Sequence, residues 1–460
     1  MAYKYLQIRD KVINQAKRTP GNRVPSEHEI CRMFAVSRTT AIKALNSLAA
    51  DKLVRREVGR GTFLVRSQVN AVIHLLVNRH DRNFTSFANL IAPAFSAANP
   101  DVDVRVDAVD ATQWVREIIT RPGMKVACAS HVGYLSDSGI LRPLHDLPGF
   151  EPLCKRLLPY VAWRTGADGK ALCDSLPLML APDALLINLG LAEELGLDAV
   201  RGPADWAELA DWAGRARRVQ RHGQPAMGAS IVPGHRLPLS YLLSSSGCRH
   251  VIRAEGGRVG FDSSGIETWL SFFHGLHHNG AMPLYPAGNL DPVLLGNALF
   301  SPWGSTWAIS QQRDLANGER LAVQRIPPVR AGQRSCCEIG GLEVALVRNL
   351  ECSEAELDAA WRLVRFMVGD QSAQRLLVDT FSCLSVLRGL HEEQCADPRF
   401  RPFIDLLEGG VRRSDHPLQH PLLRIVHAYF HRCVLGDLTV ARAAERIAEG
   451  CALQIEIGVR

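Results

Sequence analysis

The spacing of residues 26–50 constrains the fold more than any other feature of the chain. Ser26 is followed three residues later by Glu29, which is the pattern of a capping box at the start of a helix. The pattern predicts one helix over about 26–34 and a second, capped helix over about 37–50. Two short helices joined by so short a turn are typical of a helix-turn-helix.

The second predicted helix has one polar and one apolar face. At about 100° per residue, its polar face carries Thr39 and Lys43, and its first turn carries Arg38 and Thr40. The opposite face is predicted to pack and carries Ile42, Leu45 and Leu48. Arginine can bond a guanine edge or a phosphate, threonine can contact either, and a helix N-terminus favours an anion. These residue types in this order suit a DNA-reading helix.

A hairpin is predicted directly after this helix. Residues 53–65 alternate in character and are rich in β-branched side chains, and Gly59-Arg60-Gly61 supplies the turn. Such a wing would lay Arg60 into a minor groove or along a DNA backbone. Another helix is predicted before residue 19, where apolar residues recur at helical spacing.

The basic charge of the chain is concentrated in this N-terminal segment. The 460 residues carry a net charge of +6, but residues 1–67 hold 14 lysines and arginines against 5 acidic residues. The remaining residues hold 39 basic against 42 acidic side chains. This asymmetry predicts that one end of the chain contacts a polyanion and that the rest does not.

Three segments in the order 24–27, 34–40 and 59–63 resemble the GntR family of winged-helix regulators. The sequence departs from that family's pattern at His28 and Ile42, where the family usually has arginine. The resemblance implies a homodimer that binds double-stranded operator DNA. It implies contacts from Ser26, Glu27, His28, Ser37, Arg38, Thr39, Thr40, Lys43, Arg60 and Gly61.

From Ala71 onward the sequence alternates between strand-like and helix-like segments, which predicts a parallel sheet with helices on its faces. The predicted strands are 71–77, 102–109, 126–129, 180–187 and 342–347. The predicted helices are 86–97, 112–119, 205–219, 265–278 and 355–367, with three more in 399–460.

Segments 97–102, 139–144, 202–209, 300–308 and 359–374 of this α/β body resemble family 1 extracellular solute-binding proteins. The resemblance implies a two-lobed periplasmic-binding-protein-like domain of type 2. We therefore expect a winged helix-turn-helix over 1–67 and a solute-binding domain over 71–460. Lobe 1 is predicted over about 71–182 and 295–335, and lobe 2 over about 183–294 and 336–460.

Ligands of α/β sheets bind at the carboxyl ends of strands, which selects candidate loops in this body. An aromatic face suits a sugar ring, and a glycine pair lets backbone N–H groups approach a ligand closely, so a small polar solute of the sugar class is expected. The candidate ligand-binding residues are Asn78, Arg79, His131, Tyr134, Asp183, His235, Arg236, Trp303, Gly304, Gly340 and Gly341.

We predict no catalytic site, metal site or cofactor. His427 and His431 have the spacing of metal ligands on a helix, but no carboxylate follows in a metalloprotease pattern. Neither a nucleophile elbow nor a glycine-rich phosphate loop occurs. The 12 cysteines are scattered, which is typical of a reduced protein, and the chain has no apolar run long enough to span a membrane and begins without a secretory pattern. A cytoplasmic location is expected.

Two alternatives remain open at this point. The body could be an aminotransferase-like domain that holds pyridoxal phosphate, which would need a Schiff-base lysine among Lys125, Lys155 and Lys170. Alternatively, the chain could be a solute receptor that acts through a protein partner, with the basic segment as a docking arm.

Overall fold

The computed structural model divides into two compact units, residues 1–71 with 98–103, and residues 72–97 with 104–460. It describes residues 4–458 except 18, 20–22, 51–52, 58–60, 65–68, 80–81, 111–112, 131, 133–134, 136–138, 166–170, 222, 230–237, 249, 256–257, 286–290, 315–319, 350 and 413–417. No helix in this described part is long and apolar enough to cross a bilayer.

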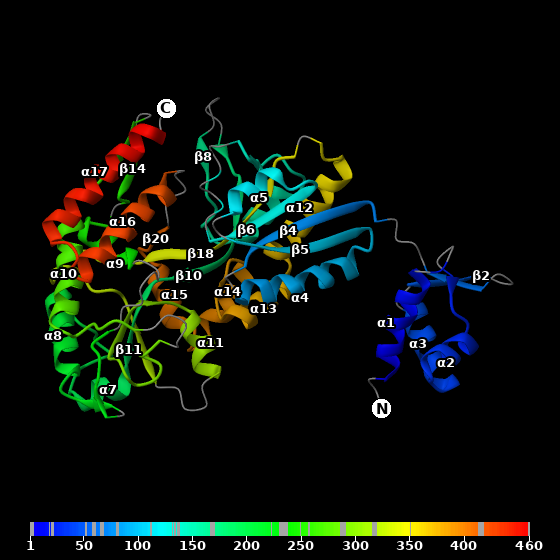
Figure 1. Ribbon diagram of the computed structural model, residues 1–460, viewed down its shortest axis with the longest axis horizontal. Helices are drawn as coiled ribbons and strands as arrows, with labels where there is room; N and C mark the ends of the chain where they lie inside the picture. Colours follow the sequence, from blue (N-terminus) through cyan, green and yellow to red (C-terminus); the bar gives the residue numbers. More distant parts are fainter. Residues whose placement is uncertain are drawn as a thin grey trace. The chain divides into compact units, whose positions relative to one another are not determined.

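The first unit contains the predicted helix-turn-helix and wing (Figure 1). Its elements are α1 (Lys4–Lys17), β1 (Arg23–Val24), α2 (Glu27–Phe34), α3 (Arg38–Ala50), β2 (Val54–Glu57) and β3 (Gly61–Leu64), with an antiparallel sheet of order β1-β3-β2. Val12, Ile30 and Leu48 are fully buried in its core. On α3 the buried residues also include Ala41 and Ala44, whereas Ile42, predicted to pack, is only half-buried.

The second unit contains two main sheets, and the larger sheet forms what we name the first lobe. It has eight strands in the order β19-β10-β18-β6-β4-β5, with β7 and β20 pairing to β18. The strands are β4 (Ala71–Asn78), β5 (Val102–Val109), β6 (Met124–Ala129), β7 (Leu141–Arg142), β10 (Ser175–Pro182), β18 (Glu338–Val347), β19 (Leu384–Ser385) and β20 (Val411–Arg412). β4 and β6 are parallel, but β18 runs antiparallel to both β6 and β10, so the sheet is mixed and the prediction of a parallel sheet was wrong for these strands.

Helices cover this sheet and bury its apolar side chains. They are α4 (Arg82–Ala98), α5 (Trp114–Thr120), α6 (Phe150–Arg156), α12 (Glu354–Gly369), α13 (Gln371–Phe381), α14 (Arg388–Cys395) and α15 (Arg401–Leu407). Aromatic contacts join helices that are distant in sequence, since Phe95 of α4 meets Phe366 of α12 and Phe84 meets Phe381 of α13.

The second lobe is built on a three-stranded sheet of order β16-β11-β17. Its elements are β11 (Ala184–Asn188), α7 (Leu189–Glu194), α8 (Trp206–Ala216), α9 (Leu239–Ser245), α10 (Ile266–His278), β16 (Phe300–Gly304), α11 (Trp307–Asp314), β17 (Leu321–Gln324), α16 (Gln419–Val434) and α17 (Val440–Gly458). Four short strands form two hairpins, β12 (Gln220–Arg221) with β13 (Gln224–Pro225) and β14 (Ile252–Glu255) with β15 (Arg258–Phe261); a third, β8 (Arg164–Thr165) with β9 (Ala171–Leu172), precedes β10.

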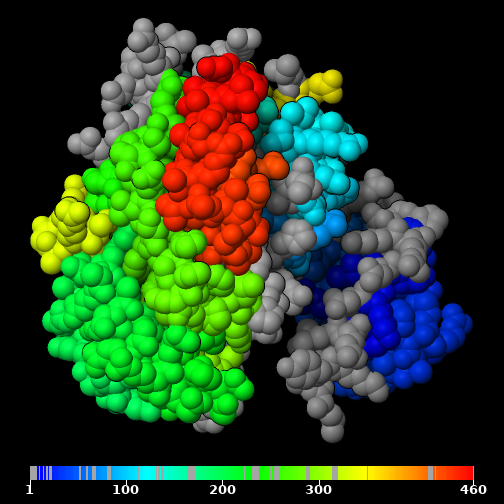
Figure 2. Space-filling view, turned by 60° about the vertical axis from the view of Figure 1, so that its left-hand side comes forward, coloured from blue at the N-terminus to red at the C-terminus, as the bar shows by residue number. Residues whose placement is uncertain are grey.

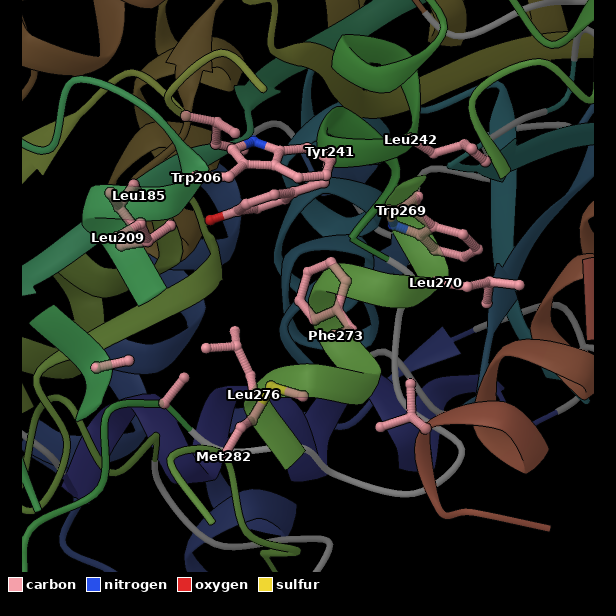
Figure 3. Packing of buried hydrophobic residues seen from close by; sticks show 14 of the residues in the cluster. Leu185, Trp206, Leu209, Tyr241, Leu242, Trp269, Leu270, Phe273, Leu276 and Met282 are labelled. Atoms are coloured by element: carbon pink, nitrogen blue, oxygen red, sulfur yellow. The ribbon is translucent and has the colours of Figure 1, made fainter. Parts of the chain in front are cut away.

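Aromatic side chains fill the core of the second lobe (Figure 3). Trp206, Tyr241, Trp269 and Phe273 are buried together, and Phe430 of α16 stacks on Trp269 with ring centroids 4.5 Å apart. Figure 2 shows α17, in red, lying along the green surface of this lobe, and α10 contacts both C-terminal helices. The three helices predicted over 399–460 are thus α15, α16 and α17, of which only α16 and α17 join this core.

The predicted division of the body into lobes was wrong in two places. Residues 300–304 and 321–324 pair with β11 of the second lobe, not with the first. Residues 338–347 pair with β10 and β6 of the first lobe, not with the second. The predicted strand 180–187 is also two strands, because the chain leaves the first sheet after Pro182, which has no N–H to donate, and enters the second sheet after Asp183.

Candidate functional site

The helix-turn-helix is held by short-range hydrogen bonds around α2. The Ser26 backbone N–H donates to Glu29 Oε2 at 2.7 Å, and the Glu29 N–H donates to Ser26 Oγ at 3.3 Å, which is the predicted capping box. The hydrogen bond from the Ser26 backbone lowers the pKa of the Glu29 carboxyl. At the other end, Ala35 takes a left-handed conformation with φ of 50°, which turns the chain toward α3.

Arg38 is presented to solvent at the first position of α3. Its side chain is 81% exposed, and its Nε donates to Glu27 Oε2 at 3.2 Å. A guanidinium has five N–H donors, so this contact fixes the side chain by one edge and leaves the Nη donors of another edge available. An arginine oriented in this way suits bidentate contact with a guanine or a phosphate.

The first turn of α3 is also ordered by hydroxyl groups. The Ser37 and Thr40 hydroxyls lie 2.9 Å apart, and the Thr40 N–H donates to Ser37 Oγ at 3.3 Å. Thr39 and Lys43 are exposed on the predicted polar face, and His28 is exposed on α2. The structure therefore brings nearly all of the sequence-predicted DNA-contacting residues onto neighbouring surfaces of α2 and α3.

The wing contacts the same helix through a residue pair that the sequence did not indicate. Arg56 of β2 donates from Nη2 to Asn46 Oδ1 of α3 at 3.3 Å, and both side chains are exposed. Gly61 begins β3 with φ of +116°, a conformation that favours glycine. Arg60, the predicted wing residue, lies outside the described residues.

In the described part of the body, two segments cross between the lobes, the first at Asp183 and the second at Glu338. They contact each other at Asp183. The Asp183 N–H donates to the carbonyl oxygen of Glu338 at 2.9 Å. Ser240 of α9 binds both segments, because its hydroxyl donates to Asp183 Oδ2 at 2.8 Å and accepts from the Glu338 N–H at 2.7 Å. All three residues are buried. Asp183 was predicted as a ligand contact, but the structure gives it a definite role in joining the crossovers.

Other predicted ligand residues lie at the ends of the strands. Asn78 is the last residue of β4, and the Arg79 side chain, which is exposed, donates from Nη2 to the carbonyl of Ala108 at 3.3 Å. Trp303 lies in β16, half-buried against the aromatic core of the second lobe. A Cβ on Gly304 would lie 2.2 Å from Leu186 Cγ, so close packing of β16 on β11 already requires a glycine there.

Gly340 and Gly341 lie within β18 opposite β10. Gly341 has φ of +149°, and a Cβ on it would lie 2.0 Å from the carbonyl oxygen of Met179. The glycine is therefore required by the neighbouring strand, and a ligand role for it stays a prediction. His131, Tyr134, His235 and Arg236 lie outside the described residues.

A polar cavity of about 270 Å³ lies where α11 meets α13 and α14, and none of the predicted ligand residues lines it. It is lined by charged pairs that neutralise each other, Arg375 with Glu393 at 2.7 Å and Arg399 with Asp397 at 2.6 Å. Over the described part of the chain, no group of three or more histidine, cysteine or acidic side chains is arranged to hold a metal ion.

Comparison with known proteins gives separate matches for the two units. Residues 4–64 match the family described as bacterial regulatory proteins, gntR family. A probable fructoselysine utilization operon transcriptional repressor of Escherichia coli (strain K12) is 34% identical over 73 residues, and the same match is found in Shigella flexneri. These 73 residues are 15% of this chain, which spans only 30% of those relatives.

The body is similar in fold to several solved structures. The GacH receptor of Streptomyces glaucescens GLA.O, solved with acarbose, is 18% identical with a TM-score of 0.67, covering 84% of this chain and 98% of that chain. The cyclic alpha-maltosyl-1,6-maltose binding protein of Arthrobacter globiformis is 16% identical with a TM-score of 0.64, covering 84% and 99%. A protein solved with mannotriose is 15% identical with a TM-score of 0.65, covering 83% and 100%.

At these identities the structural matches establish the fold of the body. That fold replaces the aminotransferase-like alternative considered from the sequence. The chain thus joins a GntR-type winged helix-turn-helix to a body with the fold of the solute-binding proteins.

Proposed function

We propose that this chain is a transcription regulator that binds operator DNA through α3 and the wing and responds to a sugar held by the body. The observation that carries the DNA-binding part is the 81% exposed Arg38, fixed by Glu27 at the start of a helix whose polar face carries Thr39 and Lys43. A helix presented in this way can enter a major groove with its N-terminal residues toward the base edges.

In this proposal Arg38 supplies sequence specificity, and its ion pair with Glu27 contributes to that specificity. The carboxylate of Glu27 holds the guanidinium by Nε, so fewer rotamers must be frozen when DNA binds. Lys43, together with Arg55 and Arg56 on the wing, supplies attraction to the phosphate backbone, which weakens as salt concentration rises. His28 and Ile42 stand where the resembled family usually has arginine, so we expect different base preferences at the positions they face.

The sugar class of the ligand is proposed from two supports. The neighbours with the same fold were solved with acarbose and with mannotriose, or are described as binding a cyclic maltosyl-maltose. In addition, this chain carries a half-buried tryptophan, Trp303, at the end of a second-lobe strand, where a ring face could stack on a sugar. Asn78 and Arg79, at the carboxyl end of β4, are the proposed polar contacts from the first lobe.

Signal transfer is proposed to use the crossovers between the lobes. Asp183 and Glu338 are the points where the chain passes from one sheet to the other, and Ser240 binds both. Closure of the lobes on a ligand would turn about these segments. In a homodimer this change would alter the spacing of two DNA-binding units on a pseudo-palindromic site, and effects of sugar and DNA on each other's affinity must be reciprocal. This function places the chain with chromosomal DNA in the cytoplasm.

The DNA-binding proposal is tested by fluorescence anisotropy of the full chain with labelled DNA from beside its own gene. Arg38→Ala should weaken binding at least about fivefold, since a bidentate contact contributes about 1–3 kcal/mol. Arg320→Ala is the control, because Arg320 is also an exposed, ion-paired arginine but belongs to the second lobe, where it contacts Glu193. Equal, salt-independent affinities for both variants and the unchanged chain would contradict a DNA-reading role and favour a receptor that acts through a protein partner.

The sugar proposal is tested separately by thermal unfolding with acarbose, maltotriose and mannotriose as probes. A ligand that binds only the folded body raises its melting temperature, and the rise grows with the logarithm of the ligand concentration above Kd. Trp303→Ala should abolish the rise, whereas Trp163→Ala, which removes an exposed tryptophan of the first lobe, should leave it. If no sugar in a broad panel shifts the transition, the ligand belongs to another class.

A further inference from the structure

Two thiols meet beside the crossover between the lobes. Cys248 follows the end of α9 and is half-buried, and Cys336 is fully buried two residues before β18. Burial and the neighbouring Cys248 thiol both raise the pKa of the Cys336 thiol, whose Sγ lies 4.0 Å from Ser244 Oγ at the end of α9. Cys248 Sγ also donates to the carbonyl of Arg334 at 3.6 Å, so its side chain is aimed at the segment that leads into the crossover.

The backbone holds Cys248 in this position. Its N–H donates to the carbonyl of Leu243 at 2.7 Å, closing the end of α9, and its φ is +61°, a left-handed conformation that is uncommon for a residue other than glycine. Along the same helix, Ser244 Oγ accepts from the Cys336 N–H at 3.4 Å and donates to the carbonyl of Ser240 at 2.8 Å. Ser240, Ser244 and Cys248 therefore form a row against the crossover.

We propose that Cys248 and Cys336 are an oxidisable pair, converted to a disulfide by hydrogen peroxide, and that the disulfide fastens α9 to the second crossover at residues 336–338. Cys337, the neighbour of Cys336, does not take part, because its thiol donates to the carbonyl of Leu406 at 2.9 Å on the α15 side. The effect of this bond on sugar sensing rests on the proposed function, but its formation does not.

The chemistry balances with peroxide as the only co-reactant. The more exposed Cys248 sulfur attacks the peroxide O–O bond, which breaks to give a sulfenic acid and water. The Cys336 sulfur then attacks the Cys248 sulfur, the S–O bond breaks, and a second water leaves. Two thiols lose two electrons and two protons in total, and one peroxide is reduced to two waters. Because burial raises the pKa of the Cys336 thiol, we assign it the second step rather than the first.

The test uses the full chain, exposed to graded hydrogen peroxide, alkylated and digested with trypsin. The peptide 237–249 contains only Cys248, and the peptide 335–348 contains Cys336 and Cys337. We expect these two peptides to appear as one linked species, lighter than their sum by two hydrogen atoms, and to separate on reduction. Cys337→Ser should retain the link, and Cys336→Ser should abolish it.

A link that persists in Cys336→Ser, or no link at peroxide concentrations that already oxidise the half-buried Cys352, would overturn the proposal. A second readout needs neither sugar nor DNA. The Asp183 N–H, which donates to Glu338, should exchange with solvent at least about tenfold more slowly after oxidation, because the bond restrains local opening at the crossover. An unchanged exchange rate in the linked protein would refute the fastening of the crossover while leaving the DNA-binding proposal intact.

Discussion

Gly341→Ala separates two explanations for a glycine in the crossover strand β18. The sequence suggested that Gly341 lets a ligand approach the backbone, whereas the structure places a new Cβ 2.0 Å from Met179 O and 3.2 Å from Leu180 Cα of β10. A φ of +149° costs a non-glycine residue about 1–3 kcal/mol, and forcing β10 aside costs about 1–3 kcal/mol more. We therefore expect a loss of about 4 kcal/mol in the free energy of unfolding.

The assay is urea unfolding of the full chain followed by tryptophan fluorescence. All eight tryptophans lie between residues 114 and 361, so the signal reports on the body and not on the N-terminal unit. Gly389→Ala is the control, because a Cβ there meets no atom within 4 Å and the residue lies inside α14, where alanine should stabilise by up to about 1 kcal/mol. If Gly341→Ala unfolded at the same urea concentration as the unchanged chain but lost sugar affinity, the packing argument would fail.

Three further predictions concern the DNA-binding unit and the crossover. Lys43→Ala should weaken binding equally to all DNA sequences and reduce the slope of log affinity against log salt concentration by about one. Arg38→Ala should, in addition, relax the preference for particular bases. Both effects are measured by anisotropy at several salt concentrations. Glu29→Ala should destabilise the first unit by about 1 kcal/mol in circular dichroism melts and Glu29→Gln by less. The pKa of Glu29 in the folded protein is lowered from its ordinary value of 4.5. The extra stability that the charged carboxylate gives over glutamine is therefore present above pH 4.5 and is lost as the pH falls through the folded pKa. Ser240→Ala should cost the body about 2 kcal/mol in urea unfolding, because it removes two buried hydrogen bonds, whereas Ser245→Ala on the same helix should cost under about 1 kcal/mol.

The N-terminal unit could be predicted closely because its signals are local. The capping box at Ser26 and Glu29 and the serine cap at Ser37 fix helix ends within a residue of those observed, because such hydrogen bonds span only three residues. Helical periodicity correctly placed Leu45 and Leu48 in the core, but small alanines at 41 and 44 are buried as well, while Ile42 is only half-buried. An aliphatic side chain signals burial more strongly than alanine does, although both can fill a core.

The body was predictable in its elements but not in their pairing. Strand 102–109 begins and ends where the sequence predicted. The assignment of residues 338–347 to a lobe was wrong, because hydrogen bonding between strands that are distant in sequence leaves no local sequence pattern. The crossover shows the same limit. Asp183 could be nominated from its position between apolar strands, but Ser240 and Glu338, which bind it, lie 57 and more residues away. A serine on a helix carries no signal of such a role.

The central claim is that sugar binding by the body changes the affinity of the N-terminal unit for its operator. The direct measurement is an anisotropy titration of operator DNA with the full chain, at zero and at saturating concentration of the sugar that stabilises the body. Coupling energies of about 1–3 kcal/mol are typical, so we predict a change in operator affinity of at least about fivefold, matched by an equal change in sugar affinity when DNA is saturating. Identical operator affinities at zero and saturating sugar, with sugar binding verified by calorimetry, would contradict the account.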